Sequence, residues 1–83
     1  MSISKEVAVT AQAQRLSNHN ETASGELGTP DDNAAYVQVR LGANQNWVNM
    51  RPGQSVRLDS IDLYNVEFKG EVGDVIHFMG GNW

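Results

Sequence analysis

The most constraining feature of this sequence is a repeating series of short alternating segments and turns between Asn46 and Gly80. Apolar and polar residues alternate along Ser55–Asp59 and again along Tyr64–Lys69, which is the period of a strand with one buried face. Between Met50 and the first of these segments, Pro52 fixes φ and Gly53 accepts a positive φ, as a type II turn requires. The stretch therefore predicts antiparallel strands, with Pro52 and Gly53 as structural turn residues.

Four further segments complete the predicted set of strands. Trp47–Met50 precedes the Pro-Gly turn, and Val75–Met79 is almost wholly apolar, which is typical of a central strand. Ala34–Leu41 alternates clearly. Lys5–Gln14 also alternates, but its alanines and glutamines leave a helix open as the alternative. We expect an all-β fold, a small antiparallel β-sandwich or jelly-roll-like barrel of about six strands.

Two segments lie outside these strands in the expected single domain, residues 1–83. The first is a flexible N-terminal arm at residues 1–5. The second is a long polar loop at residues 18–33, in which only Ala23 and Leu27 are apolar. Long loops often carry function, so Leu27 is a candidate contact with a partner protein.

The small size of the chain predicts association with other chains. A domain of this length buries only about two-thirds of its unfolded surface, and such domains are usually reinforced by disulfides, metal ions or association. The sequence has no cysteine, and its two histidines, His19 and His77, are far apart. Disulfides are therefore excluded and a zinc site is disfavoured. We expect a homo-oligomer.

Charge and motifs exclude several classes of function. The net charge is −4, whereas nucleic-acid binders need clustered Lys and Arg. No apolar stretch approaches the ~20 residues of a membrane span, and Met1–Lys5 is not followed by the apolar core of a signal peptide. Asp59 and Asp62, like Asp31–Asn33, are explained by turns. We therefore expect no enzyme activity, no cofactor, no metal, no nucleic acid, no membrane and no small-molecule substrate.

The aromatic residues allow two interpretations. Tyr36, Trp47, Tyr64 and Trp83 are candidate interface anchors for a partner protein. The same side chains also suit stacking on sugar rings, as in a glycan-binding module or spike subdomain. The glycan interpretation requires two of them to be exposed on one face with polar neighbours.

Six short motifs follow one another along the chain, and each occurs once. They are Val7-Ala8-Val9-Thr10, Ala13-Gln14-Arg15-Leu16-Ser17, Met50-Arg51-Pro52-Gly53-Gln54-Ser55, Ile61-Asp62-Leu63-Tyr64-Asn65-Val66, Lys69-Gly70 and Gly73-Asp74-Val75. In this order they resemble small β-sandwich structural proteins of tailed bacteriophages. The polar residues 18–33 depart from that pattern.

The resemblance implies a non-enzymatic protein of the virion, assembled in the host cytoplasm. It implies a capsid decoration or cement protein that stabilises the shell, or a head–tail or tail component. The expected partners are the major capsid protein or other virion proteins and further copies of the chain.

Overall fold

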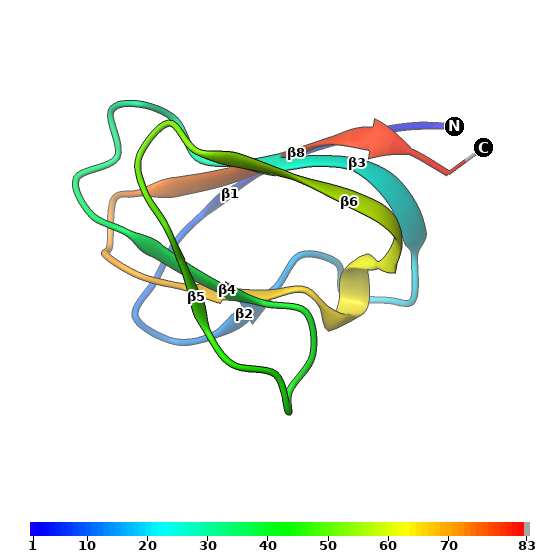
Figure 1. Ribbon diagram of the computed structural model, residues 1–83, viewed down its shortest axis with the longest axis horizontal. Helices are drawn as coiled ribbons and strands as arrows, with labels where there is room; N and C mark the ends of the chain where they lie inside the picture. The colour runs from blue at the N-terminus through cyan, green and yellow to red at the C-terminus, as the bar shows by residue number, and fades with distance from the viewer. Residues whose placement is uncertain (83) are drawn as a thin grey trace.

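The computed structural model of the protein describes residues 1–82, which fold into two layers of antiparallel strands (Figure 1). Over these residues there are eight strands and one short 3-10 helix, η1. Their bounds are β1 Ser2–Ala8, β2 Gln14–Arg15, β3 Thr22–Gly28, β4 Val37–Arg40, β5 Val48–Met50, β6 Ser55–Asp62, η1 Leu63–Asn65, β7 Glu67–Lys69 and β8 Val75–Gly81.

The strands form two four-stranded sheets. Sheet A has the order β1-β8-β3-β6 and sheet B the order β2-β7-β4-β5. Between them lies the apolar core, in which Phe68 of β7 and Phe78 of β8 are fully buried. The expected all-β fold is thus confirmed as a small β-sandwich, with two more strands than the sequence patterns predicted.

The alternation of Val37–Arg40 and the apolar run of Val75–Met79 match strands of the structure. In β4, Val37 and Val39 are buried, whereas Gln38 and Arg40 remain partly exposed. The mostly apolar β8 lies between β1 and β3, as expected for a strand with neighbours on both sides.

The other alternating segments depart from the prediction. In Ser55–Asp59, Val56 is exposed because β6 is an edge strand. In Tyr64–Lys69, the strand begins only at Glu67, after η1, and Glu67 itself is buried between two arginines.

The expectation of a loop over residues 18–33 is wrong, because its middle forms β3, a central strand of sheet A. This strand contains two glycines and lacks the β-branched composition that marks strands. Gly25 lies opposite Gly80 of β8, and a Cβ added at Gly80 would overlap the carbonyl oxygen of Ser24. Close approach of two backbones, which only glycine permits here, outweighs the low propensity of the segment.

The N-terminal segment also differs from expectation. Residues 1–5 do not form a separate arm, because β1 pairs with β8 from Ser2 to Ala8. The strand expected over Lys5–Gln14 ends at Ala8, and the chain then crosses to sheet B. The Thr10 hydroxyl donates to the Gln12 carbonyl at 3.0 Å, and this local hydrogen bond favours a turn over continued strand pairing.

A tight turn joins β5 to β6 and so connects the two sheets. The Gln54 N–H donates to the Arg51 carbonyl at 3.0 Å, and Gly53 has a φ of +82°. The Gly53 N–H in turn donates to the Thr29 carbonyl at 3.1 Å. This turn therefore sets the position of β6 relative to β3 as well as to β5.

Candidate protein-interaction surface

The two sides of the sandwich differ in how they are covered. On one side, residues 9–13 pass from sheet A to sheet B. Val9 is buried there and its N–H donates to the Asp74 carbonyl at 2.9 Å. The Thr10 carbonyl accepts from the Gly70 N–H at 2.9 Å. On the other side, β5 and β6 are the edge strands of their sheets, and the turn 51–54 connects them at one end. We call this second side the open side.

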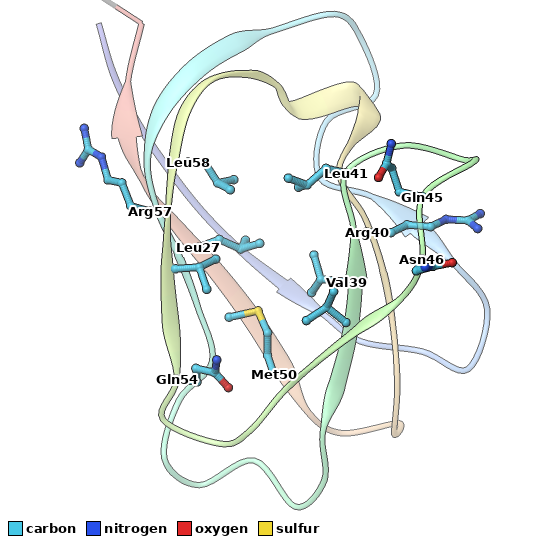
Figure 2. A pocket seen from close by; sticks show the side chains of 12 residues that line it. Leu27, Val39, Arg40, Leu41, Gln45, Asn46, Met50, Gln54, Arg57 and Leu58 are labelled. Atoms are coloured by element: carbon cyan, nitrogen blue, oxygen red, sulfur yellow. The ribbon is translucent and has the colours of Figure 1, made fainter.

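An apolar groove of about 340 Å³ lies on the open side (Figure 2). Leu58 of β6 and Leu41, which follows β4, point toward each other across it. The buried side chains of Leu27 and Met50 also line it. The groove is therefore an opening into the core between the two sheets.

Three exposed apolar side chains lie along this groove. Val48 of β5 is 62% exposed, and Leu41 and Val56 are also exposed, at 44% and 37%. A single exposed apolar residue is common on proteins, but a group beside an apolar groove is typical of an interaction site. The open side therefore has the composition of a protein-contact surface.

The charged residues that line the groove are Arg40 and Arg57. Figure 2 shows both guanidinium groups directed away from it, so only their stems contribute to its surface. The Arg57 Nε lies 3.2 Å from Asp59 Oδ1, and both side chains are well exposed. The groove itself is uncharged, and a charged pair lies beside it on the edge strand.

On sheet B, a buried carboxylate joins two arginines. Glu67 Oε1 accepts from the Arg40 Nε at 2.9 Å and from its Nη2 at 2.7 Å. Glu67 Oε2 lies 3.8 Å from the Arg15 Nη2. The register places Glu67 directly between these residues, because it is opposite Arg15 of β2 and Arg40 of β4. These two charge-assisted hydrogen bonds to one oxygen stabilise the sheet and hold the Arg40 guanidinium away from the groove.

Two predicted aromatic residues cover that arginine network. The Arg40 guanidinium lies 4.3 Å and the Lys69 ammonium 4.5 Å from the ring centroid of Trp47. Arg15 lies 4.2 Å from the ring centroid of Tyr64. Trp47 and Tyr64 are both half-buried. They share polar neighbours, but cations already cover their rings, and this limits stacking on a sugar.

The other predicted contact residues lie elsewhere. Tyr36 is 53% exposed and lines a surface hollow together with Pro52. Leu27 is fully buried on β3 and contributes to the core and the groove, so it does not project from a loop. Trp83 lies outside the described residues. Among the described residues, only Trp47 and Tyr64 share a site, and Tyr36 and Leu27 lie apart from it.

The histidines and aspartates named in the sequence analysis lie among side chains and backbone groups that explain them as structural residues. His19 lies 2.9 Å from the Asn18 side chain, and His77 packs beside Gly28. Asp62 caps η1, and the Asn20 side chain and the Glu21 N–H hydrogen-bond its carboxylate. These hydrogen bonds, the Asn20 contact first, hold the pKa of Asp62 below its ordinary value. Asp59 is exposed beside Arg57 and does not pair with Asp62.

Residues 1–82 contain neither a metal-binding cluster nor a membrane-spanning helix. No group of three or more His, Cys, Asp or Glu side chains in this part of the chain is placed to hold a metal ion. No helix among these residues is long and apolar enough to cross a membrane.

The rim residues of the groove were not among the predicted contacts. Val48 and Val56 flank the Pro-Gly turn, and the alternation of Ser55–Asp59 predicts a buried face that includes Val56. Which strands form the edges of a sheet depends on pairing between distant segments, so their exposure had no local signal.

No protein-family model matches the chain, and neither the curated proteins nor the solved structures contain a match.

Proposed function

We propose that the protein is a non-enzymatic structural protein of a bacteriophage virion, acting as a capsid decoration or cement protein. The resemblance of its strand and turn motifs to small phage β-sandwich proteins supports a location on the virion. The apolar groove on the open side, with Leu41, Val48 and Val56 exposed beside it, supports action through protein contacts. That groove is the observation that carries the proposal.

The contacts would stabilise a shell through burial of apolar surface. Each aliphatic side chain that becomes fully buried contributes about 1.5–3 kcal/mol, before the cost of association. One copy with a few such side chains binds weakly. Many copies on a symmetric shell bind together with much higher avidity, provided that their sites match the spacing of the shell.

The proposed partners follow from this mechanism. They are the major capsid protein or other virion proteins, and further copies of the chain. The net charge of −4 makes the packaged nucleic acid an unsuitable partner, since phosphate contacts need clustered cations. The protein would assemble onto the particle in the host cytoplasm.

Sedimentation of the native chain from its source lysate tests the proposal. We expect the chain to travel with a particle of megadalton size and to be released only by denaturing conditions. If it remains at the mass of a free monomer or small oligomer, the virion proposal is wrong.

A matched pair of variants tests the role of the open side. We expect Val48→Glu to weaken incorporation into the particle, because it places a charge beside the groove. Val72→Glu is the control, since Val72 is an exposed valine, 73% accessible, and does not line the groove. Equal incorporation of both variants would exclude the groove as the contact surface.

A glycan-binding module is the second candidate function. Trp47 and Tyr64 lie beside one arginine network and both have polar neighbours, as this candidate requires, but the cations on their rings make it weaker than the first. Binding to a saccharide panel that is lost in Trp47→Ala and kept in Val72→Ala would support this candidate. Absence of binding to any saccharide would remove it.

A further inference from the structure

The open side has a strand edge with a self-complementary pattern of charge. β6 is the edge of sheet A, and its regular part precedes an irregularity at Ser60, where φ is +51° and the register with β3 shifts. Such a bulge limits the length of edge that a new strand can pair with. The available edge is therefore the segment from Ser55 to Asp59.

The backbone groups of this segment alternate in direction. The Thr29 N–H donates to the Gln54 carbonyl, and the same register places Leu27 opposite Val56 and Gly25 opposite Leu58. In an antiparallel pair, every second residue of a strand directs its N–H and C=O groups toward the same neighbouring strand. The backbone N–H and C=O groups of Val56 and Leu58 therefore face β3. The N–H and C=O groups of Ser55, Arg57 and Asp59 face the free edge.

A second copy of the chain fits this edge in a register that brings opposite charges together. When two β6 strands pair antiparallel about a two-fold axis at Leu58, Arg57 of each copy lies opposite Asp59 of the other. Both side chains are already on the exposed face, 62% and 78% accessible. Centring the pair on Arg57 or on Asp59 would instead place like charges opposite each other, which is destabilising.

On the core-facing side of the strand, Leu58 would lie opposite its own copy. The irregularity at Ser60 would limit the regular pairing to Arg57, Leu58 and Asp59 of each copy. The exposed Val56 and Val48 would approach the second copy, because the free edges of β6 and β5 lie on the same side of the sandwich. A two-fold contact is closed and uses the same patch on both copies.

The opposite edge of sheet A lacks these properties. On β1, Lys5 lies opposite Phe78, a fully buried core residue, so a charge occupies the core-facing side of that edge. Inward-facing charges are a common protection of edge strands. Centring a β1 pair on Lys5 or on Glu6 would place like charges opposite each other. The difference favours β6 as the site of pairing.

We propose that two copies associate through antiparallel β6–β6 pairing centred on Leu58, with reciprocal Arg57–Asp59 contacts across the interface. This inference rests on the proposed function as an assembly protein and names the partner of the open side as a second copy. The dimer would be the unit that attaches to the particle, so that a change on the open side such as Val48→Glu would weaken incorporation through loss of the dimer.

Sedimentation of the purified full chain over a range of concentrations tests the register. We expect Arg57→Asp and Asp59→Arg each to weaken the dimer by about tenfold, since each replaces two attractive cross-strand pairs with two repulsive ones. The double variant Arg57→Asp/Asp59→Arg should restore the affinity. Glu6→Arg on the opposite edge is the control and should leave self-association unchanged.

Arg57 and Asp59 also contact each other within one chain, so the variants could act by changing the fold rather than the dimer. A second measurement separates these two effects. Circular dichroism of each variant at dilute concentration should show an unchanged fold, because an exposed ion pair contributes little to stability. A wild-type chain that is monomeric at all concentrations, or a dimer insensitive to both single variants, would overturn the inference.

A single cysteine gives an independent test, because the chain has none. Residues opposite each other at such an axis have Cα atoms about 4.5 Å apart, which suits a disulfide. We expect Leu58→Cys to form a disulfide-linked dimer under mild oxidation much faster than Val72→Cys. Equal rates would contradict the proposed axis.

These outcomes are distinct from those of the proposed function. If the native chain sediments with particles but the purified chain is monomeric and Leu58→Cys does not cross-link, the pairing is wrong and the virion proposal stands. If the dimer forms as described but no particle carries the chain, the pairing stands and the virion proposal is wrong.

Discussion

The two sides of this sandwich differ in whether their strand edges are protected from pairing with another chain. On the side of β1, the chain crosses from one sheet to the other at residues 9–13, and Lys5 places a charge at the edge. On the side of β6, an apolar groove leads into the core and valines are exposed. The covered side has features that protect a strand edge, and the open side has the features of a contact surface.

Glu67 connects the two sides, because its carboxylate contacts Arg15 of β2 and Arg40 of β4. Glu67→Gln should lower the free energy of unfolding by about 2 kcal/mol, since it weakens buried charge-assisted hydrogen bonds. Chemical denaturation measures this value. Asp59→Asn is the control, and the loss of its exposed ion pair should cost less than about 0.5 kcal/mol. Equal losses would show that the network has no special role.

A pair of valines compares the two sides directly. Val9 is buried at the crossing and Val48 is exposed on the open side. Val9→Ala should lower the free energy of unfolding by about 2 kcal/mol, because it leaves a cavity. Val48→Ala should change it by less than about 0.5 kcal/mol when measured on the monomer. A large effect of Val48→Ala at dilute concentration would mean that the open side belongs to the monomer core.

The protection of the β1 edge can be removed by design. Lys5 Nζ lies 3.4 Å from Glu21 Oε1, an ion pair without hydrogen-bond alignment. The double variant Lys5→Val/Glu21→Gln takes both charges away from this edge. We expect it to form species larger than a dimer, because pairing at β1 would add to pairing at β6. Light scattering measures this change. A variant no larger than the wild-type protein would show that Lys5 does not protect the edge.

The smallest expected effect concerns pH. The folded-state pKa of Asp62 lies below its ordinary value of 3.8, so the unfolded state binds its proton first. The stability that Asp62 contributes is therefore present above about pH 3.8 and is lost as the pH falls through the lower folded-state pKa. Asp62→Asn should lower the melting temperature at pH 6 and have a smaller effect at pH 2.5. Equal shifts at both pH values would contradict this sign.

Some of the structure followed from local sequence. Alternation in Val37–Arg40 and the apolar run of Val75–Met79 predicted strands, because burial of one or both faces requires these patterns. The fold class followed from the number of such segments and the turns between them. The position of β3 did not follow from local sequence, since its residues favour a strand only when β6 and β8 lie on either side.

Local sequence patterns were enough to predict an all-β chain, the core-facing valines of Val37–Arg40 and the Pro-Gly connection. They did not predict which strands are edges, that Gly25 and Gly80 meet, or that Val48 and Val56 face water beside a groove. The two sets of features differ in the range of the interactions that produce them. Alternation and turn chemistry act within a few residues, whereas the strand neighbours and the open side depend on contacts between segments far apart in the chain.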